Sequence, residues 1–175
     1  DGSCVWRQTQ KEQKIAVIGS GYVSLVTGTC FAKTGNQVLC VDNNLEKVSA
    51  MQAGEIPIYE PELETLFQRN WAANRLHFSH DLAEAVAFAE LIFLALPSPE
   101  LEDGVADLSY VLQVSKEIAA LATEYKIIVN KSTEPVGTTR QVQDLFDTTC
   151  AVSLDVVANP EFLKEGFAVQ DFMKH

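Results

Sequence analysis

The residues whose chemistry is easiest to read form a glycine-rich turn, followed at a set distance by an acidic residue. The turn contains, in order, Gly19, Ser20, Gly21, Tyr22, Val23 and Ser24, and Asp42 stands twenty-one positions after Gly21. Gly19 permits a tight turn, and Gly21 lacks a Cβ, so a pyrophosphate can approach the backbone. A helix that starts there offers unpaired N–H groups to the anion. Asp42 can bond the ribose hydroxyls of an adenosine and would repel a 2′-phosphate, so the pattern indicates NAD rather than NADP.

Two residues of this turn carry open questions. Ser24 stands where the pattern has a third glycine, which allows a helix to pack closely on its strand. We therefore expect Ser24→Gly to be neutral or to improve stability or cofactor binding. The hydroxyl of Tyr22 could reach a bound phosphate, and ordinary packing of its ring is an equally good interpretation.

A second set of polar residues lies near the end of the sequence, in the segment NPEFLKEG. Asn159 is a good helix cap and Pro160 suits the first helical position, so we expect a helix to begin here. Glu161 and Glu165 would then share one face of it. The helix N-terminus would favour their carboxylate form, which a general base needs. The alternative is that these acids only complement the helix dipole.

Other polar residues are less distinctive. Thr133, in the segment NKSTEP, either serves a site or caps the next helix. Lys131 and Lys164 could hold phosphates, although a lone lysine is usually solvated. We interpret the histidines as surface or strand-end residues, and these are His77, His80 and His175. The cysteine and histidine spacing predicts no metal site.

Short apolar runs bounded by turn residues predict the strands that position these groups. The expected strands are 15–18, 37–41, 76–79, 91–96, 126–130 and 155–158. Helices are expected after the glycine turn, at 45–53, 61–72, 81–88 and 107–122, up to about 146, and from 159. Strands that alternate with helices predict an α/β fold with a doubly wound, mainly parallel sheet in three α/β/α layers, the Rossmann type. The polar clusters follow strands, at the edge where such folds bind ligands.

Composition narrows the possible partners. The chain has 175 residues and a formal net charge of −11, which argues against nucleic acid and anionic membranes. No apolar run approaches the ~20 residues that span a bilayer. The four cysteines show no redox spacing, and buried free thiols in the reducing cytoplasm are the simplest interpretation. Residues 1–13 are polar and predict a flexible extension, followed by one domain over 14–175.

Taken together, the motifs GSGYVSL, IPIYEPEL, DGVADLSYV, NKSTEPVG and NPEFLKEG resemble the UDP-glucose 6-dehydrogenase family over roughly residues 14–173. The similarity is to the N-terminal NAD-binding domain of these enzymes. GDP-mannose dehydrogenases share much of the pattern, and the NKST…PVG form is more similar to the UDP-glucose branch. The resemblance implies oxidation of a nucleotide sugar at C6 to a carboxylate, by successive hydride transfers to NAD through a thioester on a cysteine.

The resemblance also implies roles for individual residues. Glu161 is implied as the acid/base for thioester hydrolysis, with Thr133 positioning the water. The implied cofactor contacts are the glycine turn, Asp42, Lys47, Ser98, Thr133 and Glu165. The implied sugar-nucleotide contacts are Glu161, Phe162, Leu163 and Lys164. A homodimer is implied for full-length members of the family.

Some positions depart from the family pattern. Ser98 stands for a usual Thr, Glu134 for a Val and Glu62 for a Gly. The family places its reactive cysteine on a C-terminal domain, and none of the four cysteines here occupies that motif. We therefore expect this chain alone not to complete the reaction. A stand-alone NAD-binding module and a GDP-mannose dehydrogenase domain are the alternatives, while NPEFLKEG argues against a hydroxyacid or acyl-CoA type.

Overall fold

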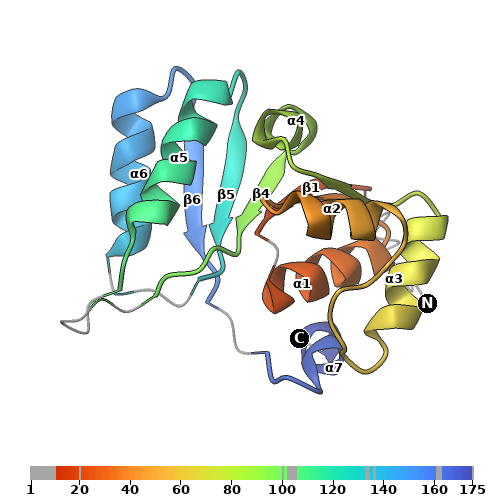
Figure 1. Ribbon diagram of the computed structural model, residues 1–175. Coiled ribbons are helices and arrows are strands. Elements are labelled where there is room, and N and C mark those ends of the chain that lie inside the picture. Colours follow the sequence, from red (N-terminus) through yellow and green to blue (C-terminus); the bar gives the residue numbers. More distant parts are fainter. Residues whose placement is uncertain are drawn as a thin grey trace, which may run out of the picture.

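A computed structural model describes residues 11–19, 21–99, 101, 106–132, 135, 137–160 and 163–174. Its centre is a parallel six-stranded sheet with the order β3-β2-β1-β4-β5-β6 (Figure 1). The strands are β1 (Lys14–Ile18), β2 (Gln37–Val41), β3 (Leu76–Ser79), β4 (Leu91–Leu94), β5 (Lys126–Asn130) and β6 (Leu154–Ala158). Neighbouring strands run in register, with Val17 opposite Cys40 on one side and Phe93 on the other. The order reverses between β1 and β4, where doubly wound sheets open a ligand crevice.

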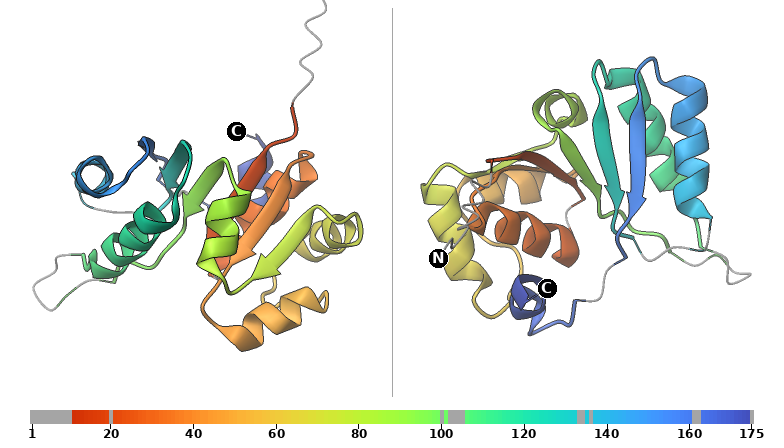
Figure 2. Two further views of the ribbon diagram at one scale, coloured as in Figure 1. Left: turned by 90° about the horizontal axis from the view of Figure 1, so that it is seen from above. Right: turned by 180° about the vertical axis from the view of Figure 1, so that it is seen from behind.

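Helices cover both faces of the sheet, which gives the expected three layers (Figures 1 and 2). The core on one face receives side chains from α1 (Tyr22–Lys33), α2 (Leu45–Gln52), α3 (Leu63–Ala72) and α7 (Ala168–Lys174). The core on the other face receives them from α4 (Leu82–Phe88), α5 (Ser109–Leu121) and α6 (Thr138–Thr149). The apolar runs of β1 and β2 are buried from their second residue onward, as the lack of alternation predicts. The predicted fold class is confirmed.

Helix α1 is buried along most of its length because it lies between the sheet, α3 and α7. At Gly28 the helix packs so near to β2 that an added Cβ would lie 2.5 Å from Cys40 Sγ. Cys30 and Cys40 are buried, as predicted, and both are free. Burial raises the pKa of each of these thiols to about 12. Close helix–sheet packing is therefore achieved one turn beyond Ser24.

Several boundaries differ from the predictions. Strand β4 ends at Leu94, two residues early, and α3 begins at Leu63 rather than at Pro61. The late start of α3 has a local cause, because Glu62 adopts a left-handed conformation with φ 67° and breaks the helical path. The predicted cap of α4 is confirmed, since Asp81 Oδ1 accepts a 2.8 Å hydrogen bond from the Ala83 N–H. Asp107 is not the N-cap of α5, which is Leu108, although Asp107 Oδ1 accepts from the Ser109 N–H at 2.9 Å.

The prediction that a helix begins at Asn159 and Pro160 is wrong. Both residues are irregular, and α7 starts only at Ala168. The Asn159 N–H instead donates to the Asn130 carbonyl at 2.8 Å, and its Oδ1 accepts from Lys131 Nζ at 3.0 Å. Asn159 therefore holds the end of β6 against β5 rather than capping a helix. The expectation that Glu165 shares a helical face with Glu161 falls with it, because Glu165 lies in a turn.

After β6 the chain runs past the carboxyl ends of the strands and returns to α1, where α7 packs (Figure 1). This path brings the late segment 163–168 close to the start of the domain. No helix in the described part of the chain is long and apolar enough to cross a membrane. Within that same part, no cluster of His, Cys, Asp and Glu could hold a metal ion.

Candidate cofactor site

A cavity of about 890 Å³ opens at the carboxyl ends of the strands, at the reversal between β1 and β4. Its lining comes from the glycine turn, the end of β2, the turn between β3 and α4, the loop after β4, helix α5 and the end of β5. The lining residues are Ile18, Gly19, Gly21, Tyr22, Val23, Val41, Asp42, Asn43, His80, Leu82, Ala95, Leu96, Pro97, Ser98, Tyr110, Gln113, Val114, Glu117, Lys131 and Ser132. The cavity lies where the fold places ligands.

The glycine turn is held close to two neighbouring strands. The Gly19 N–H donates to the Val41 carbonyl at 2.8 Å, and φ at Gly19 is 128°. An added Cβ at Gly19 would lie 2.3 Å from the Ala95 carbonyl oxygen, so a side chain cannot be accommodated. Helix α1 starts directly after Gly21 and has no acidic residue in its first turn. Its N-terminus therefore presents N–H groups and a positive dipole end to the cavity. Ser20 lies outside the described residues.

Ser24 is buried beneath this turn. Its hydroxyl donates to the Ala95 carbonyl at 3.5 Å, which is a long hydrogen bond. A Cβ at Gly19 would also lie 2.9 Å from Ser24 Oγ, so the hydroxymethyl group fills the space under the turn. The effect of Ser24→Gly stays a prediction.

Asp42 follows β2 directly and is buried, with 5% of its surface exposed. Its Oδ1 accepts a 2.5 Å hydrogen bond from the Asn44 N–H, which fixes the carboxylate at the start of α2. Asn44 in turn caps α2 by accepting from the Lys47 N–H. The Lys47 side chain is exposed and is not part of the lining. The structure thus places Asp42 in the cavity and Lys47 outside it.

Helix α5 contributes a wall that the sequence analysis missed. Tyr110, Gln113 and Glu117 recur at helical spacing and line the cavity together. The pKa of Tyr110 is raised, first by burial and then by the negative charges of Asp42 and Glu117. The signal was present in the sequence as a polar stripe at i, i+3 and i+7 beside the apolar face of this helix. His80, interpreted from the sequence as a surface or strand-end residue, also lines the cavity.

The far end of the cavity is formed by residues after β4 and β5. Ser98 is half-buried and lines it. The Ser132 hydroxyl donates to the Leu96 carbonyl at 2.8 Å and so ties the two loops together. Lys131 is 6% exposed and contacts the Phe172 ring, contrary to the expectation of a solvated lysine. Thr133 and Glu134 follow directly and lie outside the described residues.

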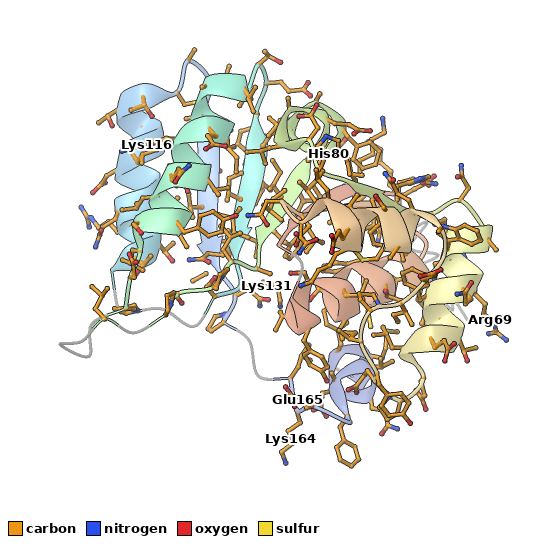
Figure 3. The ribbon with its side chains drawn as sticks, in the orientation of Figure 1. Arg69, His80, Lys116, Lys131, Lys164 and Glu165 are labelled. Carbon is orange, nitrogen blue, oxygen red and sulfur yellow. The ribbon has the colours of Figure 1, made fainter. Side chains whose placement is uncertain are left out.

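The segment 163–168 lies apart from the cavity lining. Leu163 is half-buried, whereas Lys164 and Glu165 are exposed beside α7 (Figure 3). Glu161 and Phe162 lie outside the described residues. The roles expected for all five residues stay predictions.

One buried carboxylate that the sequence analysis did not single out connects this segment to the glycine turn. Glu60 Oε2 accepts from the Tyr22 hydroxyl at 2.5 Å and from the Gly166 N–H at 2.8 Å, and Oε1 accepts from the Ala168 N–H at 2.8 Å. Burial opposes the charge of Glu60, but these donors outweigh it and lower the pKa of the carboxyl. Burial, then Glu60, raises the pKa of Tyr22, so its hydroxyl stays protonated and donates.

Comparison with known proteins identifies the family. Residues 13–175 match the family described as "UDP-glucose/GDP-mannose dehydrogenase family, NAD binding domain". The chain belongs to the UDP-glucose/GDP-mannose dehydrogenase family. NAD is therefore the cofactor of this domain, and the family is one of oxidoreductases.

Curated relatives from bacteria cover the same region. The UDP-glucose 6-dehydrogenase of Rhizobium meliloti is 47% identical over 92% of this chain and 37% of its own length. The UDP-glucose 6-dehydrogenase TuaD of Bacillus subtilis is also 47% identical, over 92% of this chain and 35% of its own length. The chain thus spans little more than a third of the length of these relatives.

Solved structures of the family have the same fold. A UDP-glucose dehydrogenase from Pyrobaculum islandicum superposes with a TM-score of 0.88 at 36% identity, covering 94% of this chain and 39% of that one. A GDP-mannose dehydrogenase from Pseudomonas aeruginosa gives a TM-score of 0.82 at 31% identity, covering 91% and 38%.

Glu62, at the position where the resemblance implies a glycine, holds a left-handed conformation with φ 67°, which glycine adopts without strain.

Proposed function

We propose that this chain is the NAD-binding part of an enzyme that oxidises UDP-glucose to UDP-glucuronate. The observation that carries the proposal is the 47% identity to proteins named UDP-glucose 6-dehydrogenase. Among the solved structures, the identity is 36% to a UDP-glucose dehydrogenase and 31% to a GDP-mannose dehydrogenase. The free thiols of Cys30, Cys40 and Cys150 fit a reducing cytoplasm.

The residues that line the cavity support NAD binding in one orientation. Gly19 and Gly21, with the N-terminus of α1, hold the pyrophosphate, because the space beside the Gly21 Cα is open and the helix dipole favours an anion. Asp42 holds the adenosine ribose from the end of β2. Ser98 and Lys131 form the opposite end, where the nicotinamide half belongs. Held by these residues, NAD would supply the hydride acceptor for oxidation of the sugar.

The steps after hydride transfer involve Glu161 and Thr133, which lie outside the described residues, and a cysteine that the family places on another domain. Oxidation of an alcohol to a carboxylate needs two hydride transfers and one water, and the family resemblance implies a cysteine thioester between them. Glu161 takes the proton of that water and Thr133 positions it. A homodimer, expected for full-length enzymes, stays a prediction.

A chimera tests the substrate. This chain replaces the matching N-terminal region of the Rhizobium meliloti enzyme, to which it is 47% identical. We expect NADH formation with UDP-glucose and far less with GDP-mannose, and none from the 175-residue chain alone. Preference for GDP-mannose would contradict the proposed substrate, and steady turnover by the isolated chain would place the nucleophile within it.

The same chimera tests the role proposed for Glu161. Glu161→Gln should allow the oxidations but starve thioester hydrolysis, so an acyl-enzyme should accumulate and be visible by intact-mass spectrometry. A slow variant without any adduct would move Glu161 from hydrolysis to substrate binding.

A further inference from the structure

Glu60 joins two parts of the molecule that are more than a hundred positions apart in the sequence. Its carboxylate is 4% exposed and accepts hydrogen bonds from the Tyr22 hydroxyl and from the main-chain N–H groups of Gly166 and Ala168. Tyr22 is the first residue of α1, and Ala168 is the first residue of α7. One side chain therefore fixes the beginnings of both helices.

The two ends of this connection have different surroundings. Tyr22 lines the cofactor cavity beside Gly21, whereas Glu60 itself is not part of the lining. Gly166 and Ala168 close the segment that begins at Leu163, in which the family resemblance implies sugar-nucleotide contacts for Leu163 and Lys164. Figure 1 shows α7 packed beside α1.

We propose that Glu60 is a positioning residue that couples NAD binding at Tyr22 to the conformation of the segment 163–168. The donors to the Glu60 carboxylate come from the start of α1 and from the segment 163–168. A shift in the position of the Tyr22 ring therefore moves the carboxylate to which the Gly166 and Ala168 N–H groups also donate. A buried carboxylate with several donors tolerates little displacement, because each lost donor leaves charge unsatisfied. Cofactor binding that fixes Tyr22 therefore also fixes the segment.

The coupling is reciprocal, which makes it measurable from either end. If NAD tightens the segment, then loosening the segment weakens NAD by the same factor. This rests on the proposed function only in the placement of NAD in the cavity and in the implied contacts of Leu163 and Lys164 with the sugar nucleotide. The link between the two segments stands on the hydrogen bonds alone.

Hydrogen exchange with and without NADH tests the coupling in the intact chain. We expect the amides of Gly166 and Ala168 to exchange on the order of tenfold more slowly when NADH is bound. Glu60→Gln keeps the side-chain volume but replaces one acceptor oxygen by an amide donor. It should abolish this transmitted protection and weaken NADH on the order of tenfold, although Glu60 does not line the cavity.

Two further sets of variants give the matched comparison. Tyr22→Phe removes only the hydroxyl and should also abolish the transmitted protection. Tyr125→Phe and Asp155→Asn break a similar tyrosine–carboxylate hydrogen bond of 2.7 Å, outside the cavity lining, and should leave it unchanged. A melting temperature lowered by Glu60→Gln with unaltered NADH affinity would show that Glu60 only stabilises the fold.

Two results on the unaltered chain separate the possible failures. NADH binding seen by fluorescence, without slower exchange at Gly166 and Ala168, would overturn the coupling and leave the cofactor site intact. If the chain bound no NADH at all, both the assignment of the cofactor site and the proposed coupling would be wrong. Failure of the UDP-glucose chimera with coupling present would contradict only the proposed substrate.

Discussion

Replacing Glu62 with glycine should stabilise the domain. Glu62 has φ 67° and ψ −18° at the start of α3, its side chain is exposed, and it makes no capping hydrogen bond. A left-handed conformation costs a non-glycine residue on the order of 1–2 kcal/mol. Glycine removes that cost but loses roughly 0.5–1 kcal/mol through the greater freedom of the unfolded chain. The net expectation is a gain of about 0.5–1 kcal/mol.

Thermal and urea unfolding of the intact chain measure this gain. For a domain of this size the melting temperature should rise by roughly 1–4 °C. Asn74→Gly is the matched control, because Asn74 also has positive φ, 56°, but asparagine tolerates that conformation. The gain at Asn74 should be much smaller. Equal gains at the two sites, or a loss of stability at Glu62, would refute the strain as the cause.

Three further predictions concern the site. The chain should bind NADH more tightly than NADPH in fluorescence titrations, and Asp42→Ala should weaken NADH roughly ten- to a hundredfold, as expected for lost hydrogen bonds to a charged group; tighter NADPH binding would remove Asp42 from the ribose. Ser24→Gly should be neutral or raise the melting temperature, since the bond from Ser24 Oγ is long at 3.5 Å; a clear decrease would show that this hydroxyl is needed. Because the folded-state pKa of Glu60 is lowered, its stabilisation is fully present above the ordinary carboxyl value of 4.5 and is lost as pH falls through the lower folded value. The difference in unfolding free energy between the unaltered chain and Glu60→Gln should therefore be constant near neutral pH and shrink in acid; a difference that persists undiminished at the lowest accessible pH would contradict this assignment.

The sheet and the location of the cavity could be predicted because their signals are local. The run before Gly19 has no polar alternation, and Asp42 follows the next such run at the required distance. Both features depend on residues that are close in sequence. The cavity at the carboxyl ends of β1 and β4 then follows from the topology.

The parts that could not be predicted depend on distant partners. Asn159 and Pro160 carry local helix-start signals, yet the hydrogen bonds of Asn159 to Asn130 and Lys131 use the side chain elsewhere. Glu60 lies between prolines in a stretch without periodicity, and its partners are 38 to 108 positions away. No local pattern encodes such a contact.

The two buried thiols allow local opening of this domain to be measured by thiol labelling. Cys30 lies in α1 and Cys40 in β2, and with a pKa of about 12 neither is appreciably a thiolate at neutral pH. Alkylating reagents attack the thiolate, so modification has to wait until helix and strand separate. With Cys4 and Cys150 replaced by serine, the labelling rate would report the free energy of that separation, and NADH should slow it to the extent that the bound cofactor holds α1 on the sheet.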